Sequence, residues 1–271
     1  MADGNGCFKA QILAVAILVS TYPNMIHAQS ASPAQQPLLL AAGSLRQAMD
    51  DILRAYQEKG GQRFEVRYGP SGNLRKEIEM GLKVDAFASA SVDHTEALAA
   101  AKLLGPSKEF THNDLCIVSR TRLAADTSGL LRSLSVPALR LATSTPVADP
   151  MGDYTWQFFR NAERSQPGIY QLLDTKALKL SGSAAPAAGN KPPYVTAFEQ
   201  NQADAYVMYC TNAVATAKAV PGLHTVRIPD ELNVPGAYGI SAHSSSAEGE
   251  ALVRFVLSRD GQAILEQYGF H

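Results

Sequence analysis

The sequence predicts an α/β fold of two lobes, each a mostly parallel sheet flanked by helices. Short apolar runs alternate with longer amphipathic segments over residues 38–271, and this order is typical of parallel strands covered by helices. The pattern restarts after Gly105-Pro106, and each half is small for a complete α/β domain. Two lobes with a ligand site between them are expected, because α/β sheets bind ligands beyond the carboxyl ends of their strands.

A strand–turn–helix unit is repeated between residues 38 and 103. In the first unit, Leu38–Ala42 predicts a strand, and Gly43-Ser44 predicts a turn. Apolar positions three or four apart from Leu45 to Tyr56 then predict a helix with Ser44 as its N-cap. The following units have strands at Phe64–Tyr68 and Val84–Ala88, turns at Gly69–Gly72 and Ser89–Ser91, and helices carrying Leu74, Ile78, Leu82, Leu98 and Leu103.

The second half of the chain is less regular. Its predicted strands are Asp114–Ser119, Leu139–Thr143, Leu178–Leu180, Ala205–Tyr209 and Ala237–Ala242. Its predicted helices lie around Trp156–Phe159, Val195–Gln200, Leu252–Val256 and Gly261–Tyr268, with loops at 144–153 and 181–193. We therefore assign residues 38–113 and 239–271 to lobe 1 and 114–238 to lobe 2, with hinge strands near 114–119 and 236–242.

The N-terminus has the features of a secretory signal peptide. A single lysine precedes the apolar stretch Ile12–Val19, and we expect cleavage after Ala28. Residues 1–28 are then the signal peptide, and the polar run 29–37 is a flexible leader. A buried N-terminal helix is the alternative, but Pro23 and the polar run argue against it.

Composition excludes several classes of protein. The 24 Lys and Arg residues nearly balance the 25 Asp and Glu residues, so the net charge of −1 lacks the basic field of a nucleic-acid-binding protein. With 46% hydrophobic and 18% charged residues, the chain is too apolar to be disordered. No apolar run reaches the roughly 18 residues that make a membrane span. We expect no nucleic-acid partner and no membrane-spanning helix.

Two cysteines remain once the signal peptide is removed. Cys7 leaves with that segment, and it lacks the preceding apolar run of a lipid-anchored protein. Cys116 and Cys210 could form a disulfide in an oxidising compartment, or they could remain two buried thiols, which is the simpler interpretation. Sequence spacing leaves both open, because it does not show whether the two Cβ atoms meet.

Residues that suit an oxyanion occur at junctions between predicted strands and helices. These junctions are Gly43–Leu45, Gly69–Asn73, Asp149–Tyr154 and Asn190–Tyr194. A helix N-terminus presents unpaired N–H groups and about half a positive charge, so it attracts anions without Lys or Arg. Ser44 and Ser71 follow successive strands, which would bring both hydroxyls to one rim of a parallel sheet. For each serine, an ordinary N-cap is the alternative.

Six segments then occur in a recognisable order: Ala41–Leu45, Tyr68–Leu74, Val84–Ser89, Asp149–Tyr154, Ala203–Ala213 and Leu257–Phe270. Together they resemble the periplasmic molybdate-binding proteins of ABC importers, and the likeness covers nearly all of residues 38–271. The resemblance implies a periplasmic, two-lobed binding protein of type II. Such a protein holds a tetrahedral oxyanion, molybdate or tungstate, in the cleft between its lobes and serves the membrane subunit of an ABC permease.

The same resemblance implies five ligand-binding residues. The hydroxyl groups of Ser44, Ser71 and Tyr209 would donate hydrogen bonds to the anion, together with the backbone N–H groups of Met151 and Lys191. It implies no catalytic residue and no cofactor, and metal enters only as the molybdenum or tungsten of the oxyanion. We expect a monomer that is not an enzyme.

Three features differ from the usual pattern of these proteins. Met151 is bulky for its position, Asp153 lies near the same helix start, and the loop at 181–193 is long. Met151 and Asp153 favour an alternative function, an extracytoplasmic sensor or accessory binding protein for a small organic or sulfur-containing anion. The side chain of Lys191 could add charge to the anion site or be a solvated loop lysine.

Other kinds of site have little support in the sequence. The six histidines lack the spacing of a zinc motif such as HExxH. Tyr206 and Tyr209 are three apart in a predicted strand and should face opposite sides, which disfavours a tyrosinate iron site and places Tyr206 in the core. No Gly-x-Ser-x-Gly motif or clear carboxylate pair points to catalysis. Asp85 is expected to hold a turn.

Overall fold

The structure is a computed structural model that describes Met1, Gly4, residues 36–183 and residues 191–271. Nearly all of the predicted signal peptide (1–28) and leader (29–37) therefore lie outside the described residues. Residues 184–190 of the loop predicted at 181–193 lie outside them as well. Residues 36–271 belong to one compact unit, and its described part contains two sheets.

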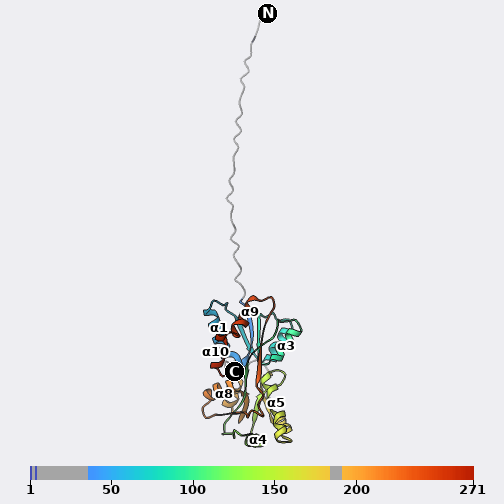
Figure 1. Ribbon diagram of the computed structural model, residues 1–271, viewed down its shortest axis with the longest axis vertical. Coiled ribbons are helices and arrows are strands. Elements are labelled where there is room, and N and C mark those ends of the chain that lie inside the picture. Colours follow the sequence, from blue (N-terminus) through green and yellow to red (C-terminus); the bar gives the residue numbers. More distant parts are fainter. Residues whose placement is uncertain (2–3, 5–35, 184–190) are drawn as a thin grey trace. The chain divides into compact units, whose positions relative to one another are not determined.

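Lobe 1 is built on a sheet of five strands, counted over the described residues, in the order β2-β1-β3-β10-β4. Its strands are β1 (Leu38–Ala42), β2 (Glu65–Gly69), β3 (Ala86–Ser89), β4 (Lys108–Asn113) and β10 (Gly236–Ala242). Its helices are α1 (Arg46–Glu58), α2 (Ser71–Glu79), α3 (Val92–Ala100), α9 (Ala247–Val256) and α10 (Arg259–Gln267). Figure 1 shows α1, α3, α9 and α10 gathered around this sheet.

Lobe 2 is built on a second sheet, again of five strands in the described chain, in the order β7-β6-β8-β5-β9. Its strands are β5 (Leu115–Ser119), β6 (Leu141–Ser144), β7 (Leu178–Ser181), β8 (Ala205–Tyr209) and β9 (His224–Arg227). Its helices are α4 (Thr127–Ser135), α5 (Pro150–Ser165), α6 (Ile169–Lys176), α7 (Pro193–Glu199) and α8 (Cys210–Ala219). The predicted α/β fold of two lobes is confirmed.

Both sheets are mixed, but in each described sheet four of the five strands run in the same direction, so the prediction of mostly parallel sheets is confirmed. In lobe 1, β1 is parallel to β2 and β3, but β10 is antiparallel to β3 and β4. In lobe 2, β6 is parallel to β7 and β8, but β5 is antiparallel to β8 and β9. Strands β5 and β10 enter their sheets directly from the other lobe. No strand–helix–strand crossover sets their direction, and parallel pairing requires such a crossover.

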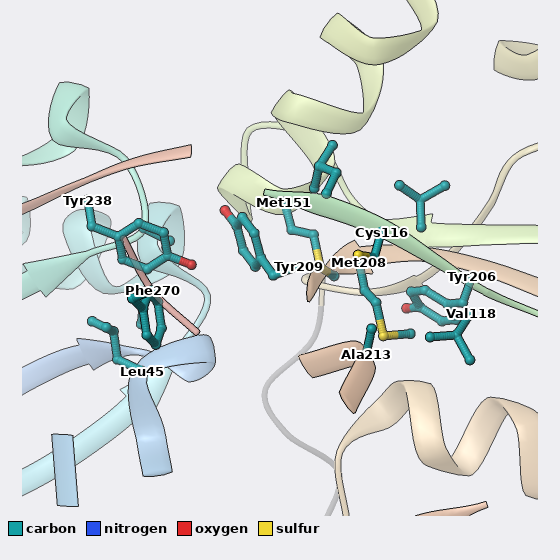
Figure 2. Close-up of a cluster of buried hydrophobic side chains, with 14 of the residues drawn as sticks. Leu45, Cys116, Val118, Met151, Tyr206, Met208, Tyr209, Ala213, Tyr238 and Phe270 are labelled. Atoms are coloured by element: carbon teal, nitrogen blue, oxygen red, sulfur yellow. The ribbon is translucent and has the colours of Figure 1, made fainter. Parts of the chain in front are cut away.

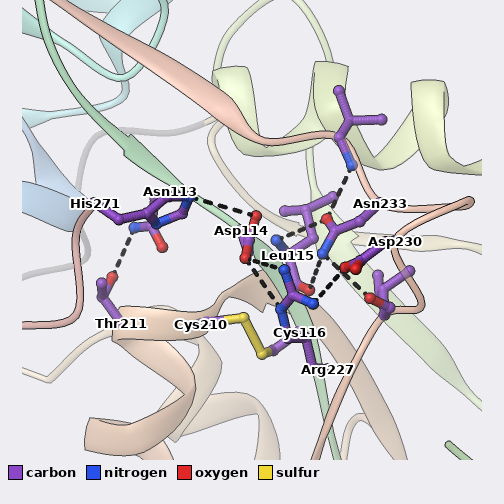
Figure 3. The surroundings of a disulfide bond; sticks show 12 residues. Asn113, Asp114, Leu115, Cys116, Cys210, Thr211, Arg227, Asp230, Asn233 and His271 are labelled. Atoms are coloured by element: carbon purple, nitrogen blue, oxygen red, sulfur yellow. Dashed lines mark hydrogen bonds and ion pairs between the residues drawn. A yellow bond between two sulfur atoms is a disulfide. The ribbon is translucent and has the colours of Figure 1, made fainter.

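The chain passes between the lobes twice, after β4 and before β10, and both predicted hinge positions lie at these crossings. Figure 3 shows how the crossing segments are tied together. The guanidinium group of Arg227 donates to the Asp114 carboxylate at 2.6 and 3.1 Å. The side chain of Asn233 accepts from the backbone N–H of Leu115 at 3.0 Å and donates to its carbonyl at 3.3 Å. Each crossing is therefore held in place by the other.

Local sequence accounts for the first elements of lobe 1. Residues 39–42 of β1 are buried, as expected for an apolar strand with neighbours on both sides. Helix α1 buries the apolar stripe Met49, Ile52, Leu53 and Tyr56 that its spacing predicts. None of the helices in the described part of the chain combines the length and the apolarity that crossing a bilayer requires.

The structure tests the predictions made for Ser44 and Asp85. Ser44 is not the N-cap of α1, because Gly43–Leu45 form a 3₁₀ turn and the helix begins only at Arg46. Asp85 is structural, as predicted. Its carboxylate accepts hydrogen bonds from the Leu38 backbone N–H and the Ser246 hydroxyl, both at 2.7 Å. Asp85 thereby joins the start of β1 to the N-cap of α9.

The sequence does not predict five elements of the described chain: β4, α4, α6, α8 and β9. Strands β4 and β9 lie at the edges of their sheets and are largely polar, so they lack the apolar pattern of a buried strand. Helix α8 follows β8 without a break and consists mostly of small residues, which leaves little apolar periodicity. Helices α4 and α6 are short.

Cys116 and Cys210 form a disulfide, with their Cα atoms 4.8 Å apart (Figure 3). Cys116 lies in β5 opposite Met208 of β8, and Cys210 follows β8 as the first residue of α8. Strand pairing therefore brings together two cysteines separated by 94 positions. The interpretation as two buried thiols is wrong.

We expect this disulfide to be a major stabiliser of the fold, because it joins two residues 94 positions apart in the sequence. Removing a native disulfide costs roughly 2–5 kcal/mol, mainly by restoring freedom to the unfolded chain. The double variant Cys116→Ser/Cys210→Ser should lose about that much free energy of unfolding in urea titrations. Reduced wild-type protein is the control and should match the variant. Equal stability of the variant and the oxidised wild type would contradict the prediction.

Candidate functional site

A cleft of about 560 Å³ lies between the two lobes. Lobe 1 contributes the turns after β1 and β2, and lobe 2 contributes the ends of β7 and β8 and the starts of α5 and α7. All five residues predicted from the resemblance line this cleft: Ser44, Ser71, Met151, Lys191 and Tyr209. The fold thus brings distant segments to one site, and ligand binding by these residues stays a prediction.

Ser71 presents a buried hydroxyl group at the start of α2. Only 1% of the residue is exposed, and its Oγ accepts a hydrogen bond from the Ala90 backbone N–H at 3.0 Å. Because Oγ is the acceptor in that bond, its own proton remains free to be donated. The turn after β3, which carries Ala90, therefore orients the Ser71 hydroxyl as a donor.

Ser44 is oriented by a residue from the far end of the chain. Its Oγ lies 2.8 Å from the hydroxyl oxygen of Tyr238, a fully buried residue of β10. The Asn113 side-chain amide donates to the same Tyr238 oxygen at 3.4 Å, and either hydroxyl can be the donor in the bond between Ser44 and Tyr238. When Tyr238 donates, the Ser44 proton is available to a ligand.

Tyr209, the last residue of β8, has a buried hydroxyl group without a hydrogen-bond partner among the described residues. The residue is 2% exposed, and Figure 2 shows its ring between Tyr238 and Met151. An unpaired buried hydroxyl costs about 1–3 kcal/mol, so a donor kept in this state suits a partner from outside the chain. Burial raises the pKa of Tyr209 well above its ordinary value, so the phenol remains a protonated donor.

Tyr206 lies in the core of lobe 2, as predicted, and is fully buried. Its hydroxyl donates to Ser181 Oγ at 2.8 Å and lies 3.3 Å from the Thr143 carbonyl oxygen. Burial raises its pKa, so this phenol also stays protonated. Because these contacts hold Tyr206 away from the cleft, it does not pair with Tyr209 as a second phenolate for iron.

Asp149 also lines the cleft, although the sequence does not predict it as a site residue. It is the N-cap of α5: Oδ1 accepts the Met151 N–H at 3.2 Å, and Oδ2 accepts the Ser144 hydroxyl at 2.6 Å. The Met151 N–H predicted to bind the ligand therefore already has a partner. Burial raises the pKa of Asp149, and these two hydrogen bonds oppose the rise. An Asp before Pro150 is a signal for this N-cap.

Two other charged groups near the cleft are directed elsewhere. The Asp153 carboxylate accepts the Val147 N–H at 2.9 Å, and Asp153 does not line the cleft. The Lys191 ammonium contacts both carboxylate oxygens of Glu199 at 2.8 and 2.9 Å, and 65% of the side chain is exposed. Lys191 is thus a solvated loop lysine, and only its backbone remains a candidate for ligand binding.

Arg46 and Tyr194 also line the cleft and were not among the predicted site residues. The Arg46 guanidinium lies 4.2 Å from the centre of the Tyr68 ring, a cation–π contact. Arg46 is the first residue of α1, a position where the helix dipole disfavours a cation. This unfavourable placement is the sequence signal that could have identified Arg46 as a site residue. Burial raises the pKa of Tyr194 to about 12.

The lobes touch beside the cleft. The Asn73 side-chain amide of lobe 1 donates to the Gly182 carbonyl of lobe 2 at 3.2 Å. A Cβ on Gly72 would lie 2.2 Å from the Val147 carbonyl oxygen, so this approach requires glycine. Val147 itself has a φ of 69°, a conformation unfavourable for a β-branched residue. The two lobes therefore meet at backbone carbonyl groups of lobe 2.

The sequence of residues 38–271 matches the family model of the bacterial extracellular solute-binding proteins. The chain belongs to this family. It is 35% identical over 238 residues to an uncharacterized protein of Pasteurella multocida, a match that covers 86% of this chain and 97% of that protein. It is 28% identical over 267 residues to the molybdate-binding protein ModA of Mycobacterium tuberculosis, covering 94% and 93%.

Solved structures share the fold of this solute-binding protein. The Azotobacter vinelandii periplasmic molybdate-binding protein has a TM-score of 0.69 at 18% identity, covering 87% of this chain and 99% of that one. The sulfate-binding protein SubI of Mycobacterium tuberculosis has a TM-score of 0.69 at 16% identity, covering 87% and 86%. Iron-bound HitA of Pseudomonas aeruginosa has 0.61 at 17%, covering 86% and 85%. The resemblance to molybdate-binding proteins is confirmed, and the chain is a solute-binding protein of the ABC-transporter type.

Replacing Tyr209 by Phe tests whether its hydroxyl group is paired within the chain. In Tyr209→Phe, loss of a buried hydroxyl without a protein partner should leave the free energy of unfolding unchanged or raise it by about 1 kcal/mol. The matched variant Tyr206→Phe removes a bonded hydroxyl and should lose about 1 kcal/mol. Urea unfolding measures both. Destabilisation of Tyr209→Phe equal to that of Tyr206→Phe would show that Tyr209 is paired within the chain.

Proposed function

We propose that this solute-binding protein captures a tetrahedral oxyanion in the periplasm and delivers it to the membrane subunit of an ABC permease. Molybdate or tungstate is the ligand proposed first, because molybdate-binding proteins are among its relatives. One observation carries the proposal: the Tyr209 hydroxyl, unpaired within the described chain, lies at a cleft that Ser44 and Ser71 also line.

Neutral donors suit this task because they replace the water around an anion with groups that are already oriented. The Ala90 N–H fixes the hydroxyl of Ser71, and Tyr238 fixes that of Ser44. The N-terminus of α2, where Ser71 lies, adds a partial positive charge. Selectivity then depends on cavity size and hydrogen-bond geometry. An anion that contacts both lobes favours their closed arrangement, which a permease can distinguish from the open one.

We further propose that the protein acts by binding alone, as a monomer without a cofactor. The described residues that line the cleft include no histidine to serve as a general base. A molybdenum or tungsten atom would be held only through the oxygen atoms of its oxyanion, because hydroxyl and N–H groups donate to oxygen. No covalent step is needed for capture and release.

A second function is favoured by the size of the cleft. About 560 Å³ lies within the range of pockets for organic ligands, and Tyr194 and Phe270 add aromatic surface. An extracytoplasmic sensor or accessory protein for another small anion, organic or sulfur-containing, fits this volume. The ligand then decides between the two functions.

Calorimetric titration of the purified protein with molybdate, tungstate, sulfate, thiosulfate and phosphate tests the proposal. We expect molybdate to bind with a Kd of about 1 µM or tighter. Ser71→Ala should weaken binding by at least about tenfold, since a hydrogen bond to a charged group contributes about 1.5–3 kcal/mol.

The control is Ser241→Ala, a buried serine whose hydroxyl donates to the Gly105 carbonyl at 2.7 Å and which does not line the cleft. Its affinity for the anion should equal that of the wild type. Absence of heat with all five anions would contradict oxyanion capture. Binding of small organic anions in its place would support the second function.

A further inference from the structure

Asp149 places a carboxyl group in a cleft whose other polar side chains are mostly donors. Each of its oxygens accepts one hydrogen bond, from Ser144 or from the Met151 N–H, and each retains a further acceptor position. Within the described residues, no Lys, Arg or His forms an ion pair with Asp149. Its charge is therefore not neutralised by the protein.

The carboxyl group is also fixed in position. A Cβ on Gly182 would lie 2.8 Å from the Cβ of Asp149 and 2.4 Å from the Oγ of Ser144, so the end of β7 packs tightly against both residues. Gly182 has a φ of 85°, which glycine adopts without strain. Asp149 is thus enclosed between β6, β7 and α5, and its carboxyl group stays in place when an anion enters the cleft.

The groups that face Asp149 do not compensate for its charge. Asp153 on the same helix carries a like charge and raises the pKa of Asp149 further. Burial is the main cause of the raised pKa values of Tyr194, Tyr206 and Tyr209, and the Asp149 charge adds to the rise at each of them. These three phenols are neutral.

The cations that line the cleft do not pair with Asp149. Arg46 of α1, on the other lobe, stacks on Tyr68 and keeps its positive charge, and the Lys191 ammonium is paired with Glu199. Asp93 of α3 adds another negative charge near Asp153. A dianion in this part of the cleft would lie beside the Asp149 carboxylate, and two like charges close together cannot both remain ionised without a large cost.

We propose that the cleft binds its anion together with one proton, held between the Asp149 carboxyl group and an oxygen atom of the ligand. The inference rests on the proposed function, that an oxyanion occupies this cleft. When the ligand is molybdate, tungstate or sulfate, which carry no proton at neutral pH, solvent supplies the proton to Asp149. When the ligand is hydrogen phosphate or a phosphomonoester monoanion, the ligand brings it. No other bond forms or breaks.

Asp149 is then a specificity-determining residue. A site with a buried acceptor rejects a ligand that has no donor for it, because the acceptor is left unpaired beside a charge. As pH rises and Asp149 in the free protein ionises, unprotonated anions lose affinity, whereas anions that retain a proton do not. The order of preference among oxyanions therefore changes with pH.

Titration calorimetry on the mature protein between pH 5 and 9, in buffers of different ionisation enthalpy, tests this inference. In wild-type protein, molybdate affinity should fall tenfold per pH unit above the pKa of Asp149, with uptake of one proton per molybdate. In Asp149→Asn, molybdate affinity should be independent of pH, proton uptake should vanish, and the molybdate-to-phosphate affinity ratio at pH 8 should rise at least tenfold. Asp149→Ser should behave in the same way. Both replacements keep an N-cap for α5.

Asp153→Asn is the matched control: it removes a nearby carboxyl of the same helix that does not line the cleft. It should keep the uptake of one proton per molybdate and the tenfold fall in affinity per pH unit, with the fall beginning at a lower pH because Asp153 no longer raises the pKa of Asp149. Molybdate binding without proton uptake, and with equal affinity in wild-type protein and Asp149→Asn at every pH, would overturn the inference and leave the proposed function intact. Absence of any anion binding in both proteins would overturn the proposed function itself.

Discussion

The antiparallel pairing of β5 with β8 sets the geometry of the cleft. Leu115, the first residue of β5, lies opposite Tyr209, the last residue of β8. The backbone N–H of Cys210 donates to the Asp114 carbonyl at 2.8 Å, so the ladder reaches the point where the chain passes between the lobes. A shift of register by one residue would turn Tyr209 to the other face of the sheet. The lobe crossing and the cleft phenol are thus positioned by the same hydrogen bonds.

The two serines of the cleft are oriented by hydrogen bonds to other residues of the chain. Ser71 is a donor because the Ala90 N–H occupies its oxygen, and Ser44 is held by its hydrogen bond with the Tyr238 hydroxyl. Tyr209 has no such partner in the described chain, and Asp149 is the one carboxyl group of the lining. The anion site is therefore built mainly from hydroxyl groups that the fold holds in position.

The sequence predicts those parts of the structure that depend on local patterns. The strand–turn–helix order of residues 38–103 is read from periodicity, and β8 has the predicted bounds Ala205–Tyr209 because it is apolar throughout. The antiparallel direction of β10 and the disulfide depend on contacts between distant segments, which periodicity does not contain. Asp149 is visible in the sequence as an N-cap, but its place in the cleft depends on how the lobes pack.

The ring closed by Cys116 and Cys210 encloses β5 to β8 and α4 to α7, most of lobe 2, whereas the residues of lobe 1 include no cysteine. The disulfide therefore restricts the unfolded chain of lobe 2 but not that of lobe 1, and the two lobes need not unfold at the same temperature. A molecule in which lobe 1 has opened keeps Tyr209 and loses both serines of the cleft. A ligand that bridges the lobes binds only when both are folded. Its binding therefore stabilises lobe 1, which lacks the disulfide, together with lobe 2. Occupancy of the cleft therefore couples the stability of the two lobes.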